Sequence, residues 1–190
     1  MTDFKAIFGK KIKFQTTDLT MSTATEGELF YSNADSKFKV GVTVLAWSAG
    51  GALTISRKSG SGFGIQTAAV FAGGQTGGGG KELKAEEYDG SSWTASGDMN
   101  TARTQLQGTT AGTQTAGLVF GGNIPPGSAP HAGESTATEE YNGSTWTSGN
   151  NMATTVTSHG GSGTQTAAFS AGGSEGGTAK DNSQEYDGTN

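Results

Sequence analysis

The sequence predicts an all-β protein with two parts, a small N-terminal β-hairpin segment (residues 1–46) and a run of four-stranded repeats (residues 47–190). Three observations predict this fold. Glycine is concentrated in the second part, short blocks of sequence recur there about every 50 residues, and aromatic residues occupy fixed positions in those blocks. Only three of the 33 glycines, Gly9, Gly27 and Gly41, precede Trp47. We therefore place the domain boundary near Trp47.

Composition excludes several classes of protein. The glycines follow no three-residue period and are accompanied by only 3 prolines, which excludes collagen. The net charge of −5 predicts no nucleic-acid partner, because binding to phosphates needs a basic face. The absence of cysteine excludes disulfides, thiol catalysis and zinc–thiolate sites. No apolar run reaches the roughly 18 residues of a spanning helix, and the scattered lysines of residues 1–20 do not fit a signal peptide, so we expect no membrane insertion.

The first 46 residues have ordinary strand and turn patterns. Residues 11–14 alternate between polar and apolar side chains, which is typical of a half-buried strand. Residues 28–31, 32–37 and 38–40 indicate a strand, a polar turn and a second strand. A segment with so few apolar side chains buries little core of its own. We expect it to become ordered by docking on the following domain, on its own copies or on a partner.

A repeat fills the second part of the chain. Its first block begins with Gln-Thr-Ala and ends with paired glycines, and its copies start 48 and 51 residues apart, at Gln66, Gln114 and Gln165. Its second block carries a tyrosine followed by Asp-Gly or Asn-Gly, in residues 86–94, 139–147 and 184–188. One column holds Tyr88, Tyr141 and Tyr186, and another holds all three tryptophans, Trp47, Trp93 and Trp146. Each unit of about 50 residues is therefore one structural repeat.

Each repeat is predicted to contain four short strands. The Gln-Thr-Ala block is a strand of small residues, suited to an interior where backbones approach closely. A glycine-rich loop of variable length follows it, and Tyr-Asp-Gly or Tyr-Asn-Gly then predicts a two-residue hairpin turn, which needs positive φ at both central residues. The Trp strand comes next, and a Thr-rich stretch after Leu53, Met99 or Met152 leads to the next repeat. Radial stacking of such sheets would bury both faces of each.

The order of paired glycines, tyrosine and tryptophan resembles the kelch repeat of β-propellers, whose period is about 50 residues. Arg57 and Arg103, four residues after Leu53 and Met99, match the arginine of that family, whereas Val156 departs from it. The tyrosine-to-tryptophan spacing of five is also shorter than is usual in the family. The resemblance implies kelch-like propeller blades. About three are present, which makes an incomplete propeller, because closure needs about four to eight.

Two further features resemble bacteriophage proteins. Two sequence motifs of the repeat are similar to repeats of tail-fibre and other virion proteins, namely Gly-Thr-Gln-Thr-Ala and Glu-Glu-Tyr-Asn-Gly-Ser-Thr-Trp-Thr. Residues 26–31 with 37–40 resemble the short hairpin module at the start of such proteins. The resemblance implies a structural protein of the virion, in which residues 1–46 dock on other virion proteins.

Metal and phosphate sites have few candidates in this sequence. His131 and His159 lie in loop-like stretches, where we expect them to be exposed, and two histidines without cysteine rarely make a metal site. The glycine runs at 77–80 and 172–177 lack the lysine and the following Ser or Thr of a phosphate-binding loop, so they are interpreted as loop tips. We therefore assign no metal ligand and no cofactor.

Paired carboxylates and aromatic residues are the other candidates. Glu86–Glu87 and Glu139–Glu140 could serve as the acid and the nucleophile of a glycosidase. They recur at equivalent positions, however, and neighbouring strand residues point to opposite faces, so we interpret them as scaffold. We interpret the repeated tyrosines and tryptophans as core residues, in preference to surfaces on which sugar rings stack. We assign no catalytic residue and leave the ligand-binding residues open.

The leading hypothesis is a non-enzymatic virion protein, a tail fibre or tail-associated host-attachment protein. It would assemble in the host cytoplasm and display propeller loops to a glycan or other receptor of the host surface. The alternatives are a capsid-decorating or head-fibre protein and a polysaccharide-degrading propeller enzyme. Because the tryptophan expected after Tyr186 would fall just beyond Asn190, we expect further repeats downstream. We also expect a homo-oligomer, and a homotrimer that closes partial units around one axis is the alternative explanation of the incomplete repeat.

Overall fold

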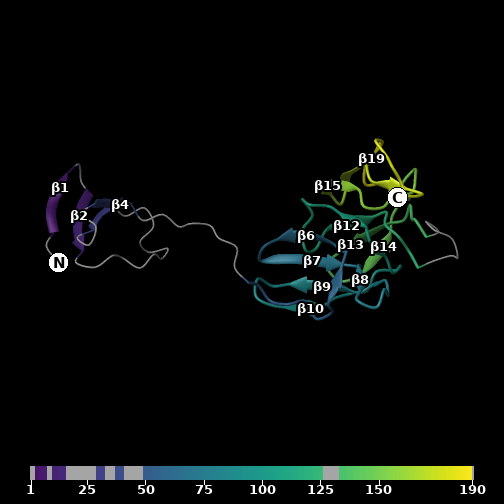
Figure 1. The fold of residues 1–190 in the computed structure, drawn as a ribbon, viewed down its shortest axis with the longest axis horizontal. Coiled ribbons are helices and arrows are strands. Elements are labelled where there is room, and N and C mark those ends of the chain that lie inside the picture. Colours follow the sequence, from purple (N-terminus) through teal and green to yellow (C-terminus); the bar gives the residue numbers. More distant parts are fainter. Residues whose placement is uncertain are drawn as a thin grey trace. The chain divides into compact units, whose positions relative to one another are not determined.

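The computed structural model describes the backbone of four strands within residues 1–40, together with residues 49–125 and 133–189. The described residues form strands and turns and no helix, so the all-β prediction is confirmed (Figure 1). The chain divides into two compact units, Met1–Ala49 and Gly50–Asn190. Trp47, near which the boundary was predicted, lies outside the described residues.

The N-terminal unit contains one four-stranded sheet in the order β1-β2-β3-β4. Its strands are β1 (Asp3–Ile7), β2 (Lys10–Gln15), β3 (Leu29–Ser32) and β4 (Lys37–Val40). β2 contains the predicted strand, and β3 and β4 pair antiparallel as the predicted hairpin requires. β1, which was not predicted, pairs antiparallel with β2, and β2 runs parallel to β3.

The repeats form three antiparallel sheets, which we call the first, second and third sheet. The first consists of β6 (Ser61–Ile65), β7 (Ala68–Ala72), β9 (Ala85–Tyr88) and β10 (Trp93–Ala95). The second consists of β11 (Gln107–Gly108), β12 (Gly117–Phe120), β13 (Thr138–Tyr141) and β14 (Trp146–Ser148). The third has three described strands, β15 (Gly160–Thr164), β16 (Ala167–Ala171) and β19 (Ser183–Tyr186). Two small ladders lie outside these sheets, β5 (Arg57–Lys58) with β8 (Gln75–Thr76) and β17 (Ser174–Glu175) with β18 (Thr178–Ala179).

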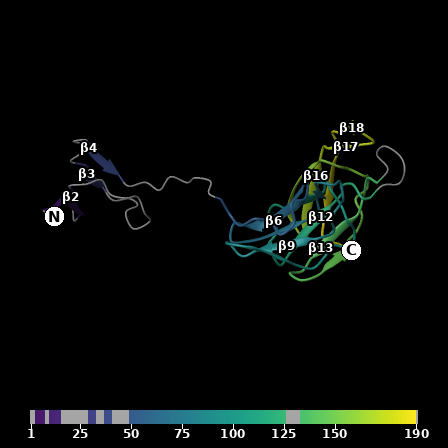
Figure 2. The ribbon, with the colours of Figure 1, turned by 60° about the horizontal axis from the view of Figure 1, so that its bottom comes forward.

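The three sheets pack face to face in sequence order (Figures 1 and 2). Their first strands lie together, since β6 contacts β11 and β11 contacts β15. No sheet among the described residues closes on itself. The structure therefore has two four-stranded sheets and one sheet with three described strands, whose first strands neighbour one another, and the three described sheets form no closed ring.

Apolar side chains fill both junctions between sheets. One buried cluster lies between the first and second sheets and is made up of Phe63, Val70, Ala72, Ala85, Met99, Leu106, Val119, Tyr141 and Trp146. A smaller cluster between the second and third sheets contains Leu118, Phe120 and Ala168, with Met152 and Tyr186 packed against it. Neighbouring residues of β12 thus point to opposite junctions, which is why the whole strand is buried.

The predicted two-residue turn after each tyrosine was wrong. Tyr88 pairs directly with Trp93, so four residues form the loop, and only Gly90 in that loop has positive φ (96°). The Asp89 carboxylate accepts hydrogen bonds from the backbone N–H groups of Ser91 and Ser92, both at 2.8 Å. These bonds hold the pKa of Asp89 well below its usual range. The aspartate side chain, rather than a tight turn, therefore determines the loop conformation.

The two described tryptophans of the repeat, Trp93 and Trp146, differ in burial, which gives a stability prediction. Trp146 is 6% exposed, and its Nε1 donates to the Gly97 carbonyl at 2.9 Å, whereas Trp93 is only half-buried. We expect Trp146→Ala to lower the free energy of unfolding by about 3–5 kcal/mol, and Trp93→Ala to lower it by clearly less. Urea denaturation of both variants measures the difference. Equal losses would contradict the packing described here.

Candidate functional site

Two buried ion pairs join each of the first two sheets to the segment of chain that precedes it, which we call the linker. Arg57 Nη2 lies 2.8 Å from Glu86 Oε1, and Arg103 Nη2 lies 2.7 Å from Glu139 Oε1. The side chains of both arginines are fully buried, and both carboxylates are nearly so. The first glutamates of the two Glu-Glu pairs therefore have structural partners, and neither is presented to solvent.

Further hydrogen bonds surround each pair. Arg103 Nη1 donates to the carbonyls of Ala137 (2.6 Å) and Gly121 (3.2 Å), so one guanidinium holds three segments together. The Thr54 backbone N–H and hydroxyl both donate to Glu86 Oε2 at 2.7 Å. Burial alone would raise the pKa of Glu86, but the hydrogen bonds from Thr54 and the charge of Arg57 outweigh it and lower this pKa. Glu86 is thus stabilised as a carboxylate.

The third repeat replaces both members of the pair that joins linker and sheet. Val156 stands where the first two repeats have arginine, and Gln184 stands where they have the paired glutamate. The Gln184 side chain still bonds the linker, since Oε1 accepts from the Thr154 N–H at 3.0 Å. A neutral amide replaces the carboxylate where the arginine is missing, so no buried charge is left unpaired. Sequence reasoning missed this pairing, although the joint change at 156 and 184 was the signal that could have found it.

The second glutamate of each pair contacts the tyrosine of the next sheet. The Tyr141 hydroxyl donates to Glu87 at 2.5 Å, and the Tyr186 hydroxyl donates to Glu140 at 2.5 Å. Burial raises the pKa of Tyr141 to about 12, and the bond to Glu87 adds to the rise. A glycosidase needs two carboxylates that face one substrate. Here the two members of each pair have different partners on different elements.

His159 lies in the core, so the expectation of an exposed loop histidine was wrong. It is 6% exposed, and its ring packs against Phe120 with centroids 5.4 Å apart. Neither ring nitrogen has a hydrogen-bond partner among the described residues. Burial lowers the pKa of His159 to about 4. His159 therefore behaves as an aromatic core residue at neutral pH, and His131 lies outside the described residues.

Three loops, one from each repeat, contact one another and form what we call the loop surface. They follow the paired glycines and comprise residues 75–81, residues 123–134 as far as they are described, and residues 174–180. Lys81 Nζ donates to the Asn123 side chain and to the Ile124 carbonyl. The Gly176 N–H donates to Glu134 at 2.9 Å, which links the second loop to the third. The predicted glycine-rich tip at 77–80 belongs to this surface, and so do residues 174–177 of the tip predicted at 172–177.

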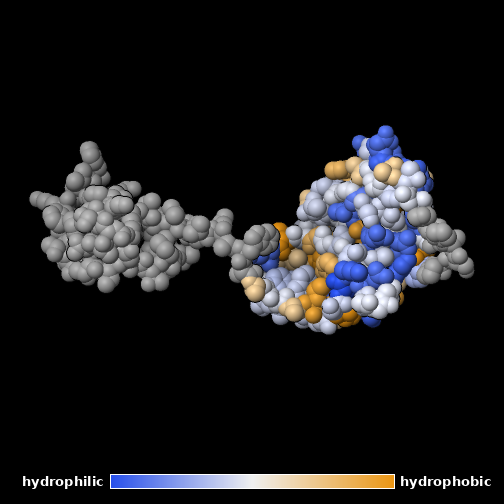
Figure 3. All heavy atoms as spheres, viewed as in Figure 1, coloured by the Kyte–Doolittle hydropathy of each residue, from blue (hydrophilic) through white to orange (hydrophobic). Residues whose placement is uncertain are grey.

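The loop surface is polar, and its second loop is longer than the other two. Its side chains include lysine, glutamate, threonine and asparagine, and Glu175 pairs with Lys180 at 2.9 Å. The hydrophilic surface in Figure 3 includes the region where Figure 1 places β8. Added atoms at Gly77 or Gly78 would meet nothing within 4 Å. Loop tips of this kind accept sequence changes without a cost in packing.

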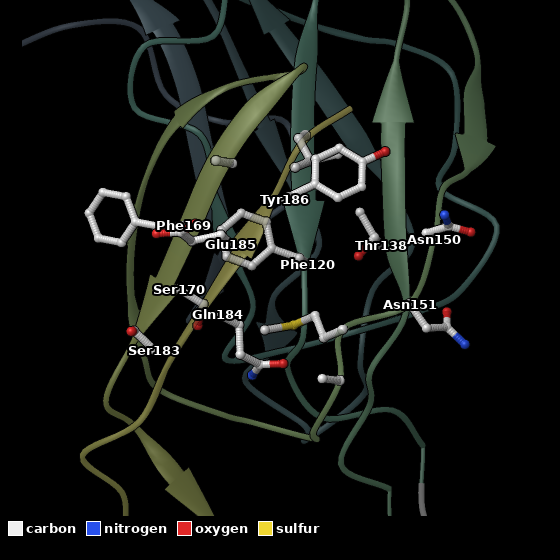
Figure 4. A pocket seen from close by; sticks show the side chains of 14 residues that line it. Phe120, Thr138, Asn150, Asn151, Phe169, Ser170, Ser183, Gln184, Glu185 and Tyr186 are labelled. Atoms are coloured by element: carbon white, nitrogen blue, oxygen red, sulfur yellow. The ribbon is translucent and has the colours of Figure 1, made fainter. Parts of the chain in front are cut away.

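A cleft of about 350 Å³ lies between the second and third sheets. Asn150 and Asn151 lie at one side of it and Phe169 and Ser183 at the other, with Tyr186 between them (Figure 4). At the preceding junction Trp146 packs against the equivalent tyrosine, Tyr141, with ring centroids 4.7 Å apart. Part of this cleft thus corresponds to the place that a tryptophan occupies in the repeat pattern.

Neither a protein-family model nor a curated protein matches this chain. Within the described residues, no group of three or more His, Asp or Glu side chains is arranged to hold a metal ion. No helix that is long and apolar enough to cross a membrane occurs in the part of the chain that the structure describes.

The replacement of both arginine and glutamate in the third repeat, by Val156 and Gln184, leads to a double-mutant prediction. Glu139→Gln leaves Arg103 as a buried charge without a carboxylate, so we expect a loss of about 3–5 kcal/mol in unfolding free energy. The double variant Arg103→Val with Glu139→Gln reproduces the residue types of the third repeat. Its loss of unfolding free energy should be smaller than the sum of the losses in the two single variants, Arg103→Val and Glu139→Gln. Urea denaturation of the four proteins measures this coupling. Additive losses would show that the pair does not act as a unit.

Burial of His159 generates a pH prediction. The folded-state pKa of about 4 lies below the unfolded value of about 6.5, so the unfolded chain binds more protons between these values. Stability should fall as pH decreases from 6.5 to 4, by about 3 kcal/mol from this residue. His159→Phe should remove that part of the slope. An unchanged slope in urea denaturation from pH 7 to pH 4 would contradict the assignment.

Proposed function

We propose that this chain is a non-enzymatic structural and attachment protein of a bacteriophage virion. Its repeats are blades of a kelch-like β-propeller, and its loop surface binds a glycan of the host surface. Residues 1–46 anchor it to other virion proteins, at the tail rather than the head. The single observation that carries the binding role is that variable loops of three successive repeats meet in one polar surface.

The division of contacts between sheets and loops supports a binding role. The repeated groups that could act as acids or bases, Glu86 and Glu139, are buried and paired with arginines. Hydroxyl, amide, ammonium and carboxylate groups are gathered instead on the loop surface, where they match the hydrogen-bonding groups of a carbohydrate. Scaffolds that carry binding residues on loops are common, because loops change without disturbing the core.

The propeller assignment is supported by the order of strands in the first two sheets. Each is a four-stranded antiparallel meander whose first strand lies beside the first strand of the next sheet. This is the arrangement that radial stacking of blades requires. The kelch-like order of paired glycines, tyrosine and tryptophan places the same residues at the same positions of successive sheets.

Binding of the full chain to immobilised lipopolysaccharide and capsular polysaccharide tests the loop surface. We expect the double variant Gly78→Asp with Thr178→Asp to weaken binding at least about tenfold, because both positions are exposed and the new charges repel acidic glycans and displace hydrogen bonds. Thr94→Asp, exposed on β10 outside the loop surface, is the matched control and should bind normally. Shortening of the polysaccharide would contradict the non-enzymatic assignment.

Deletion of residues 1–46 tests the anchor. The shortened protein should keep its glycan binding and fail to be incorporated into phage particles, as measured by mass spectrometry of purified particles. Normal incorporation would contradict the anchoring role and leave the binding role standing.

A further inference from the structure

His159 is a buried ionisable group that the proposed attachment function does not use. It is 6% exposed, and neither ring nitrogen has a hydrogen-bond partner among the described residues. The ring packs against Phe120, and a Cβ atom added to Gly121 or Gly173 would lie 2.7 Å from an atom of His159. The histidine is therefore enclosed by close-packed atoms at the junction between the second and third sheets.

The equivalent position in the second repeat holds a leucine. Three described residues other than glycine have positive φ and mark the same place in successive repeats, namely Ser59 (56°), Gln105 (57°) and Ser158 (52°). The residues that follow them are Gly60, Leu106 and His159. Leu106 is 5% exposed and belongs to the apolar cluster of the first junction. Packing at this position thus needs only an apolar side chain, and the imidazole adds a group that can take up a proton.

The residues packed around His159 supply no charge. They are Phe120, Gly121, Val156 and Gly173, from β12, from the chain before β15 and from the chain after β16. Beyond Gly121, the Arg103 guanidinium donates to the Gly121 carbonyl at 3.2 Å, and its charge is balanced by Glu139. This ion pair therefore offers the histidine no free carboxylate.

The carboxylates of the second and third loops are also engaged. Glu134 accepts from the Gly176 N–H at 2.9 Å, and Glu175 pairs with Lys180 at 2.9 Å. Burial lowers the pKa of His159, and no described carboxylate offsets that effect. A proton on the ring would thus place an unpaired charge inside the junction, which is costly in free energy.

The segment that carries His159 also holds the bases of two loops of the loop surface. The Val156 carbonyl accepts from the Gly122 N–H at 2.8 Å, directly before the second loop. Thr157 exchanges two backbone hydrogen bonds, both at 2.9 Å, with Ser174, the first residue of the third loop. A displacement of residues 156–159 therefore breaks contacts at the base of both loops.

We propose that protonation of His159 opens the junction between the second and third sheets and releases a ligand from the loop surface. In the open state, residues 156–159 leave the junction and water hydrates the imidazolium, so acid favours this state. With a pKa of about 6.5 in the open state and about 4 in the closed state, the ratio of open to closed chains rises about 70-fold from pH 7.5 to pH 4.5. The release of ligand rests on the function proposed above, whereas the opening does not.

Hydrogen–deuterium exchange of the full chain at pH 7.5 and pH 4.5 tests the opening. Each rate is divided by that of the unfolded chain at the same pH, because the chemical exchange step itself depends on pH. We expect the amides of β15 and β16 to lose protection by about 70-fold at the lower pH, and those of β6 and β7 to change clearly less.

Substitutions at the two histidines assign the effect. His159→Leu, which copies Leu106, should remove the acid dependence of β15 and β16, and His159→Phe is a second variant that packs at the same place without titrating. His131→Leu changes the other histidine of the chain and should behave like the native protein. Unchanged protection of the native third sheet at pH 4.5, an equal loss in both His159 variants, or the same loss in all three sheets would overturn the proposal.

Binding to immobilised lipopolysaccharide and capsular polysaccharide at the two pH values tests the release. The native chain should bind at least about tenfold more weakly at pH 4.5, and the His159→Leu chain should bind equally at both. A native chain that opens in acid and keeps its ligand would contradict the release. A chain that opens in acid but binds no polysaccharide at pH 7.5 would contradict the proposed function and leave the opening in place, so the two proposals fail separately.

Discussion

The buried arginine–glutamate pair is the contact on which the repeat architecture depends. A guanidinium inside a protein is tolerated only when a carboxylate and further acceptors surround it. Arg103 meets this requirement with the Glu139 carboxylate and with the carbonyls of Gly121 and Ala137, so three acceptors hold the linker against the second sheet. Its Nε still lacks an acceptor among the described residues. The pair therefore contributes more to defining the junction than to overall stability.

Because the linkers are held in this way, the sheet faces can be built from small side chains. Only 32% of the residues are hydrophobic, and Val70, Ala72 and Val119 supply much of the first junction with three aromatic rings. Polar contacts at the edge of each face, from glutamine to carbonyl and from tyrosine to glutamate, determine the register of successive sheets. The third repeat, with Val156 and Gln184, shows that the linker can be held without a buried charge when the arginine and the glutamate are both replaced.

Periodicity was sufficient to predict the sheets, since the tyrosine and tryptophan columns identify paired strands that the structure contains. It was insufficient for contacts that depend on two distant residues. The bond between Glu87 and Tyr141 joins different repeats, and no single repeat reveals it. His159 was misjudged because its Ser and Gly neighbours indicate a turn, whereas packing against Phe120 depends on the neighbouring sheet. The Asp89 loop was misjudged because the side chain forms the hydrogen bonds that a tighter turn would make through the backbone.

The same arrangement is the reason that we propose ligand binding by the loops and not by the repeated carboxylates. A residue that repeats in successive sheets is constrained by the junction that it makes, and any change in it must be matched by a partner, as at positions 156 and 184. Loop residues such as Gly77 and Gly78 have no such partner, and added atoms there meet open space. Selection for a new ligand can therefore act on the loops at no cost to the junctions. The loop of the second repeat, residues 123–134, is longer than the loops at 75–81 and 174–180, while the first two sheets keep the same strand pairing, which is the pattern that this separation of constraints produces.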